Sequence, residues 1–373
     1  MPGSGSRRML HLALGFAISA LFAACVSSRE RPEGTTTGAD GGASGGTTSG
    51  FQGTAGGDVC GNEEHTALTT YPLLYFVFDR SGSMADLDGN ETRYARVRDA
   101  ALDMTDSLGA LVRVGATVFP SLDATATDAC LPGEEVYSPK IDPGPVFASS
   151  IDVEPGGGTP TAATLRDLLP KLSSAADPKV VILATDGAPN CDADTTCGSD
   201  TCMVNVLGEC PSDAGNCCEP PAGTWENCID RLPTLQAILD LKEAGVNVYV
   251  IGIPGSELFE TVLDQMALAG GVPQSGQSTY YYRVDDLGTL GDVFKGIASA
   301  LVSCKFDLED PPSDPGLTNV YFDNQVVVQD PSDGWVWVDG DTIELVGEAC
   351  DTLKSGAVKN VRFVSGCPTV MPE

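Results

Sequence analysis

Short apolar segments alternate with amphipathic segments between residues 71 and 303, and this alternation limits the possible folds more than any other feature. Segments 73–78 and 180–184 are apolar throughout, which is typical of a strand buried on both faces of a sheet. The intervening segments carry apolar residues every three or four positions, as amphipathic helices do. This alternation predicts an α/β fold with a doubly wound, mostly parallel sheet flanked by helices. The predicted strands are 73–78, 111–119, 147–153 at an edge, 180–184, 246–253 and 279–284, and the predicted helices are 94–108, 161–172, 235–244, 257–267 and 286–302.

The pattern changes after residue 304. Segments 320–328, 335–345 and 361–364 alternate or are apolar, and Asp339-Gly340 has the composition of a hairpin turn. We therefore predict a small C-terminal all-β module over residues 305–373. Trp335 and Trp337 lie at alternate positions and face the same side of one strand, where they could pack a core or contact a carbohydrate or protein.

The N-terminus has the features of an export signal. Two arginines precede an apolar run over 12–24, which is too short to cross a bilayer as a helix. The sequence LFAAC at its end resembles a bacterial lipoprotein cleavage box, which implies removal of residues 1–24 and lipidation of Cys25. A plain secretory signal is the alternative. Residues 25–59 are rich in Gly, Ser and Thr and are interpreted as a flexible tether.

Charge and the anchor together indicate location and partners. The chain has 52 acidic and 21 basic residues, a formal net charge of −31, so nucleic acid and anionic membrane surfaces are unfavourable partners. Contact with a membrane is expected through the lipid anchor only. Val26, rather than aspartate, follows Cys25. By resemblance to Gram-negative lipoproteins, this favours the outer membrane, on its periplasmic or surface face.

Oxygen-bearing side chains follow the ends of two predicted strands and a glycine-rich loop. Asp79 ends the first apolar segment, and Ser81 and Ser83 come at alternate positions after it. Thr159 lies in the sequence GGGTPT, and Asp186 follows segment 180–184. Ligands of open parallel sheets bind at the carboxyl ends of strands, where these groups can converge. Two carboxylates and three hydroxyls suit Mg²⁺, or alternatively Ca²⁺ or Mn²⁺. Taken singly, each residue could equally be a loop cap or turn residue.

These residues resemble the metal-ion-dependent adhesion site of von Willebrand factor type A domains, a doubly wound, Rossmann-like family. The resemblance extends over about residues 71–303 and includes FVFD, GGGTPT and LATDG. It implies a domain over residues 60–304 in which Ser81 and Ser83 coordinate the ion directly, while the other three residues bind it directly or through water. It also implies a protein partner that offers an Asp or Glu side chain to the ion.

Thirteen cysteines are present, so lipidation of Cys25 leaves an even number for disulfides. Seven of them fall in an insertion over about 188–228, where they could bind zinc or form disulfides, and an exported location favours disulfides. We predict Cys60–Cys304 and Cys350–Cys367, with Cys130 bonded to one cysteine of the insertion and three pairs within it.

The sequence thus favours a tethered, metal-dependent protein-binding or adhesion module that is not an enzyme. One alternative is a structural lipoprotein of envelope assembly, in which the metal only stabilises the fold. A metal-assisted hydrolase is another alternative. After the predicted cleavage point the chain has a single histidine, His65, so only one residue could serve as the base of a Ser–His–Asp mechanism.

Overall fold

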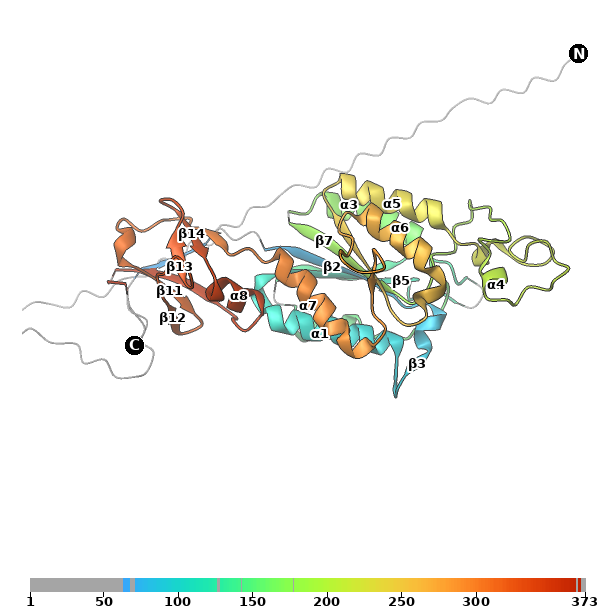
Figure 1. Ribbon diagram of the computed structural model, residues 1–373, viewed down its shortest axis with the longest axis horizontal. Helices are drawn as coiled ribbons and strands as arrows, with labels where there is room; N and C mark the ends of the chain where they lie inside the picture. The colour runs from blue at the N-terminus through green and yellow to red at the C-terminus, as the bar shows by residue number, and fades with distance from the viewer. Residues whose placement is uncertain are drawn as a thin grey trace, which may run out of the picture. The chain divides into compact units, whose positions relative to one another are not determined.

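The computed structural model describes residues 63–67, 71–125, 128–141, 143–176, 178–366 and 368–369. Its largest sheet has six strands in the order β6-β5-β2-β7-β8-β9 (Figure 1). All neighbouring pairs are parallel except β5 with β6, which confirms the predicted mostly parallel sheet. The strands are β2 Leu73–Asp79, β5 Arg113–Phe119, β6 Glu134–Ile141, β7 Lys179–Thr185, β8 Asn247–Gly252 and β9 Tyr282–Arg283.

Strand β2 shows why the central segments are apolar at every position. All seven of its residues are buried, and successive side chains enter opposite sides of the sheet. Leu74, Phe76 and Phe78 pack in one core with helices α1 and α7, whereas the alternate side chains pack in a second core with α3, α5 and α6. The two helix layers make the fold doubly wound (Figure 1). The helices are α1 Arg93–Leu108, α2 Gly144–Ser150, α3 Thr161–Ser173, α4 Met203–Val206, α5 Arg231–Glu243, α6 Glu260–Gly270, α7 Leu290–Leu301 and α8 Glu348–Lys354.

The predicted edge strand over 147–153 was wrong, because that segment lies in and just beyond helix α2. Phe147 and Ile151 are both fully buried and are four residues apart, the spacing of one helix face. The actual edge strand, β6, buries only Tyr137 and carries exposed polar residues along with Pro139. A proline without an N–H suits a sheet edge, but such a strand lacks the apolar pattern that identifies central strands.

Four disulfides organise the cysteine-rich insertion. Cys130 bonds to Cys191, and three further pairs lie within the insertion, as the sequence predicted. They are Cys197–Cys228, Cys202–Cys218 and Cys210–Cys217. The insertion also packs on the main domain, because Met203 and Val206 of α4 contact a small core that contains Ala188 and Phe259.

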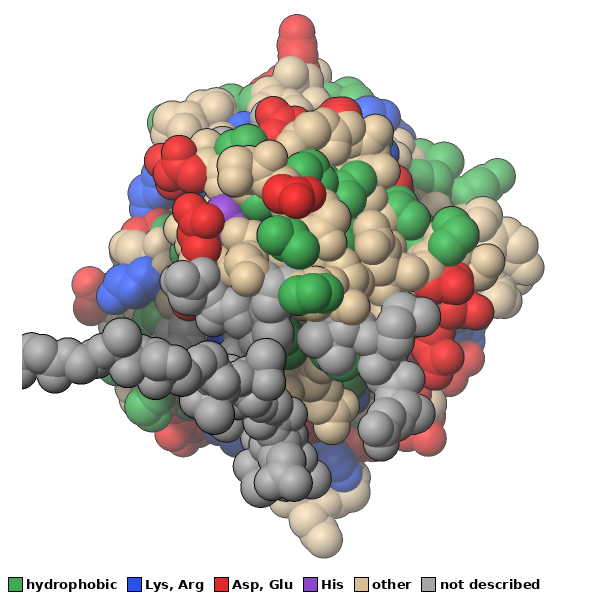
Figure 2. All heavy atoms as spheres, turned by 90° about the vertical axis from the view of Figure 1, so that its left-hand side faces the viewer, with side chains coloured by type: hydrophobic (Ala, Val, Ile, Leu, Met, Phe, Trp, Pro, Cys, Tyr) green, Lys and Arg blue, Asp and Glu red, His purple; other side chains and the backbone are tan. Residues whose placement is uncertain are grey.

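The C-terminal region forms the predicted β module from two antiparallel sheets, with one short helix, α8, that the sequence prediction lacked. Their orders are β1-β15-β11-β12 and β10-β14-β13. Strand β1 precedes the α/β domain in the chain yet pairs with β15, so both ends of the described chain contribute to one sheet. Acidic side chains are spread among neutral ones on the surface seen in Figure 2. The strands are β1 Glu63–His65, β10 Lys305–Asp307, β11 Thr318–Phe322, β12 Gln325–Val327, β13 Trp335–Trp337, β14 Thr342–Leu345 and β15 Val361–Ser365.

The predicted pairs Cys60–Cys304 and Cys350–Cys367 were wrong. Cys304 follows helix α7 and bonds to Cys350 on helix α8. Helices α7 and α8 contact each other, whereas the prediction had no helix in that region and assumed that each domain closes on itself. Cys25, Cys60 and Cys367 lie outside the described residues, as do the predicted signal segment and tether.

His65 is part of the module sheet rather than a residue ahead of the folded region. It is buried in β1, where Nδ1 donates to the carbonyl oxygen of Asp310 (2.6 Å) and Nε2 is hydrogen-bonded to Ser365 Oγ (2.7 Å). A carbonyl can only accept, which assigns the proton to Nδ1. Ser365 is itself buried between β1 and β11, so this serine–histidine pair joins strands of a sheet.

Candidate metal centre

Asp79 and Asp186 lie at the carboxyl ends of two adjacent parallel strands in the middle of the sheet. Asp79 is the last residue of β2, and Asp186 follows the last residue of β7. Their relative exposures are only 1% and 2%. Two carboxylates are therefore buried at the carboxyl ends of adjacent central strands, which is where open α/β folds bind ligands.

The Asp79 carboxylate is held by a donor on each oxygen. Oδ1 accepts from the backbone N–H of Ser81 (2.8 Å), and Oδ2 accepts from the hydroxyl of Thr185 (2.5 Å). The same Thr185 hydroxyl accepts from the N–H of Gly187 (3.2 Å). Asp79 thus has a fixed orientation between the loop after β2 and the loop after β7.

Ser81 and Ser83 connect the loop after β2 to Asp186. The two serine hydroxyls are 3.3 Å apart, and Ser83 Oγ donates to Asp186 Oδ1 (2.8 Å). Ser81 is buried and Ser83 is exposed, so the group reaches the surface. Four of the five predicted side chains therefore lie in one hydrogen-bonded group.

Thr159 lies on a loop that is bonded to the Ser81 loop through the backbone. Gly82 N–H donates to Gly157 O (2.9 Å), and Gly156 N–H donates to Arg80 O (2.6 Å). Thr159 is 7% exposed. Within the described part of the chain, no hydrogen bond joins its hydroxyl to the other four side chains. The structure therefore places Thr159 on a loop that is bonded to the Ser81 loop, but without a hydrogen bond from its hydroxyl to the group.

The run of glycines before Thr159 has a steric cause. Gly157 has φ +93°, a conformation that favours glycine. A Cβ on Gly158 would lie 2.4 Å from Cys191 Sγ, so the Cys130–Cys191 disulfide packs directly on this loop. The disulfide-rich insertion thereby supports the loop that carries Thr159.

Burial makes the charge of the two carboxylates costly. It raises the pKa of Asp79 to about 7, and the nearby charge of Asp186 adds to this rise. Burial also raises the pKa of Asp186, while hydrogen bonds from Ser83 and Arg93 oppose that change. A cation placed between the carboxylates would favour their ionised forms.

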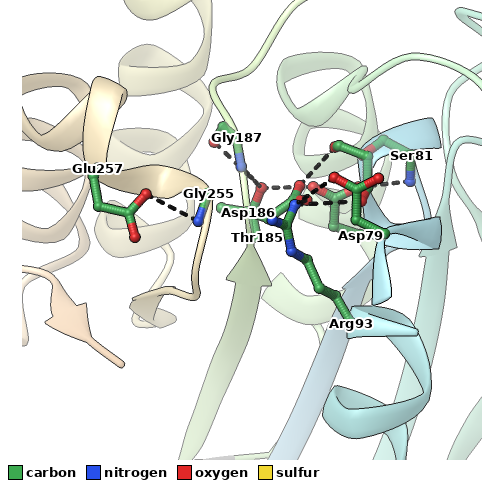
Figure 3. Close-up of polar contacts among 10 residues, drawn as sticks. Asp79, Ser81, Arg93, Thr185, Asp186, Gly187, Gly255 and Glu257 are labelled. Carbon is green, nitrogen blue, oxygen red and sulfur yellow. Dashed lines mark hydrogen bonds and ion pairs between the residues drawn. The ribbon is translucent and has the colours of Figure 1, made fainter. Parts of the chain in front are cut away.

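Arg93, in the first turn of α1, is a residue that the sequence prediction missed. Its Nη1 atom donates to Asp186 Oδ2 (2.7 Å), as Figure 3 shows, and lies 3.2 Å from Asp86 Oδ2. A positive residue at a helix N-terminus opposes the helix dipole. That mismatch is a sequence signal that Arg93 has an acidic partner elsewhere.

Two further residues that the sequence prediction missed position the loops. Arg80 donates from Nη1 to the carbonyls of Pro120 (3.0 Å) and Ser121 (2.8 Å), which joins the loops after β2 and β5. Asn190 accepts from the Thr159 N–H through its side chain (2.7 Å). Neither residue has a sequence signal, because each bonds to backbone groups far away in the chain.

The donor set suits a hard cation. Carboxylate and hydroxyl oxygens are the ligands of Mg²⁺, Ca²⁺ and Mn²⁺. Among the described residues, no cluster of three or more His, Cys, Asp or Glu side chains could hold a metal ion, so any ion here would depend on the serine and threonine hydroxyls. The Arg93 guanidinium already contacts Asp186 as a cation would. The residues therefore fit a divalent ion, although its binding remains a prediction.

The strand order and the two helix layers define a doubly wound α/β fold, and the solved structures that are similar to this chain include von Willebrand factor type A domains. The PilB minor pilin of Streptococcus sanguinis is 22% identical over 61% of this chain and 60% of its own, with a TM-score of 0.41. The pilus adhesin SpaC of Lactobacillus rhamnosus GG is 14% identical over 81% and 40%, with a TM-score of 0.47. The vWF domain of the type V pili tip protein Mfa5 of Porphyromonas gingivalis is 14% identical over 63% and 96%, with a TM-score of 0.44.

These similarities concern fold alone. The chain spans about three-fifths of the PilB structure and two-fifths of the SpaC structure. No protein family and no curated protein matches the sequence. In the part of the chain that the structure describes, no helix has the length and apolar character needed to cross a membrane.

Proposed function

We propose that the chain is an envelope-tethered, metal-dependent protein-binding module. A divalent cation, Mg²⁺ or alternatively Ca²⁺ or Mn²⁺, would be held by Asp79, Ser81, Ser83, Thr159 and Asp186. The observation that carries this proposal is the hydrogen-bonded group that runs from Asp79 through Ser81 and Ser83 to Asp186. When bound, such an ion supplies a positive centre for an oxygen ligand.

Four of these five residues already lie in one hydrogen-bonded group and have a defined part in this proposal. Asp79 and Asp186 supply two negative charges, which nearly neutralise a divalent ion. The Ser81 and Ser83 hydroxyls supply neutral oxygens, and Ser83 lies at the exposed side of the group. Because only two carboxylates are available, the ion would keep affinity for a further carboxylate from outside the chain.

The expected partner is a protein that offers an Asp or Glu side chain. The chain itself has a formal charge of −31, so an acidic partner is repelled at long range. A cation at the contact reverses that repulsion locally. Binding should therefore depend on the ion much more strongly than on the surrounding surface.

The test is a pull-down from an envelope extract with the full-length chain, in Mg²⁺ and in EDTA. We expect partners that are retained in Mg²⁺ and lost in EDTA, and lost also when Asp79→Asn is used as bait. Asp213→Asn is the matched control, because Asp213 is an exposed carboxylate on the insertion. The proposal would be contradicted if the partners retained by the wild type in Mg²⁺ were also retained in EDTA and bound Asp79→Asn equally well.

A structural role for the metal is the second candidate. It is favoured by the deep burial of Asp79, which joins two loops through Ser81 and Thr185. In that case Asp79→Asn would lower the melting temperature in Mg²⁺ but leave the pull-down unchanged. A metal-assisted hydrolase is a weaker proposal, since the buried His65 is already bonded to Asp310 and Ser365.

We also propose export and lipid anchoring at Cys25, with the protein held at the outer membrane. The support is the sequence alone, since Cys25 lies outside the described residues. Intact mass spectrometry of the mature protein tests this: a chain that starts at Cys25 with an added diacylglycerol is expected. An unmodified cysteine at that position would contradict the anchor without affecting the metal site.

A further inference from the structure

Arg93 supplies the positive charge in contact with the candidate metal centre. Its guanidinium reaches Asp186 Oδ2 at 2.7 Å from the first turn of helix α1 (Figure 3). The Asp186 side chain is fully buried, whereas that of Arg93 is 20% exposed. The ion pair thus closes the outer side of a buried carboxylate.

The donors to the two carboxylates differ in one respect. Asp79 Oδ1 and Oδ2 and Asp186 Oδ1 accept from neutral groups of the surrounding loops, namely Ser81 N–H, the Thr185 hydroxyl and the Ser83 hydroxyl. Asp186 Oδ2 alone accepts from a charged group. Neutral hydroxyls can rotate to present an oxygen to a metal ion, but a guanidinium has only donors and repels one.

The structure also provides a second partner for Arg93. The same Nη1 atom lies 3.2 Å from Asp86 Oδ2, and the Asp86 side chain is 67% exposed. Asp86 is separated from Ser83 by only two residues, so it belongs to the same side of the site. A small movement of the guanidinium would transfer it from the buried to the exposed carboxylate.

The loop after β8 makes room for this arginine. A Cβ on Gly255 would lie 2.9 Å from Arg93 Nη1 and 3.1 Å from the Asp186 carbonyl oxygen. Gly255 has φ +110°, and its N–H is bonded to Glu257 Oε2 (3.0 Å). A side chain at this position would therefore crowd the Arg93 guanidinium where it contacts Asp186.

We propose that Arg93 is an internal counter-ion that competes with the divalent cation for Asp186, and that cation binding moves it to Asp86. This inference rests on the proposed function and concerns how the same site is regulated. The chain would be stabilised without metal by its own arginine, and the affinity for metal would be lowered by the need to displace it.

The test measures metal binding directly, without a partner. The full-length chain is stripped with EDTA, dialysed and titrated with MgCl₂ and then MnCl₂ by calorimetry. Arg93→Gln should bind at least about tenfold more tightly than the wild type, because a neighbouring opposite charge changes the ionisation of a carboxylate by a similar factor or more. Its melting temperature in EDTA should fall, because Asp186 loses its charged partner and keeps only the Ser83 hydroxyl.

Arg96→Gln is the matched control. Arg96 is on the same helix and pairs with Asp88 (3.5 Å) and Glu91 (3.1 Å) of the adjacent hairpin. It removes the same charge without touching Asp186, so its metal affinity should stay within about twofold of wild type. If metal affinity rises equally in Arg93→Gln and Arg96→Gln, the cause is the change in net charge and not the contact with Asp186. That result would overturn the inference.

Two more variants separate charge from structure. Arg93→Lys keeps the charge and should stay near wild-type affinity, whereas a gain as large as that of Arg93→Gln would overturn the competition. Asp86→Asn removes the second partner and should weaken metal binding in the wild type but not in Arg93→Gln. No heat of binding in the wild type would refute the proposed function. Binding in the wild type that Arg93→Gln leaves unchanged or weakens would refute this inference alone.

Discussion

Asn190 holds Thr159 by two hydrogen bonds. The Asn190 side chain accepts from the Thr159 N–H (2.7 Å), and the Asn190 N–H donates to the Thr159 carbonyl oxygen (2.9 Å). Asn190 follows Asp186 by four residues, and its neighbour Cys191 is bonded to Cys130. The loop after β7 therefore fixes the glycine loop that carries the fifth candidate ligand.

Asn190→Ala should weaken Mg²⁺ binding several-fold. It leaves the buried Thr159 N–H without its acceptor, at a cost of about 1–3 kcal/mol in the free energy of unfolding. Calorimetric titration and urea denaturation measure the two effects. Asn216→Ala is the control, because Asn216 makes similar side chain–backbone bonds inside the insertion, to Cys197 and Cys218. It should lose stability without any loss of metal affinity.

The sequence was sufficient to predict the centre of the fold. Strands β2 and β7 are buried on both faces, so they stand out as apolar runs, and the positions of Asp79 and Asp186 follow from the strand ends. Edge strand β6 and helix α8 were missed for the opposite reason. β6 buries only Tyr137, and α8 spans seven residues, too few for a periodic pattern.

The supporting contacts of the site depend on tertiary structure. Arg93 and Asp186 are 93 residues apart, and Thr159 and Asn190 are 31 residues apart. Hydrogen bonds to backbone groups, such as those of Asn190 and Arg80, do not require a particular partner residue and therefore leave no pairing in the sequence. The sequence was therefore sufficient to propose the five candidate ligands, but not to identify the residues that orient them.

The Cys304–Cys350 disulfide should stabilise the chain without changing the metal site. It closes a loop of 46 residues, for which chain entropy predicts a contribution of about 4 kcal/mol. Cys304→Ser with Cys350→Ser should therefore lower the free energy of unfolding strongly, while Mg²⁺ affinity stays within about threefold. Cys210→Ser with Cys217→Ser is the control, because its separation of 7 residues predicts a smaller loss. A large change of affinity in the first variant, with the fold retained, would instead make this bond a switch.

Trp335 should act as a core residue and not as a contact for carbohydrate or protein. It is fully buried, and its indole N–H donates to the Val327 carbonyl (3.0 Å). Trp335→Ala should cost about 3–5 kcal/mol in urea denaturation. Trp337, which is only partly buried and lies edge-on to Trp335, should cost less when changed to alanine. Equal, small losses for both variants would contradict this assignment.

Asp230 should make stability fall as pH rises towards neutrality. It is fully buried, Oδ2 accepts from the Asp192 N–H (2.5 Å), and Oδ1 has no partner among the described residues. Burial raises its pKa from the ordinary value of 3.8 to about 7. Between pH 3.8 and about pH 7, Asp230 keeps its proton in the folded chain but has lost it in the unfolded chain. The stabilisation is therefore complete below about pH 4 and is lost as pH rises through about 7.

Asp230→Asn should remove this pH dependence, since asparagine can accept from the Asp192 N–H without becoming charged. Melting temperatures in EDTA at pH 5, 6.5 and 8 provide the measurement. The variant should exceed the wild type by less at pH 5 than at pH 8 and show a smaller fall between them. Some fall should remain, because the pKa of Asp79 is raised in the same direction. Asp213→Asn, which changes an exposed carboxylate on the insertion, should follow the wild-type curve. If the Asp230→Asn curve is parallel to that of the wild type, Asp230 is already ionised at pH 5.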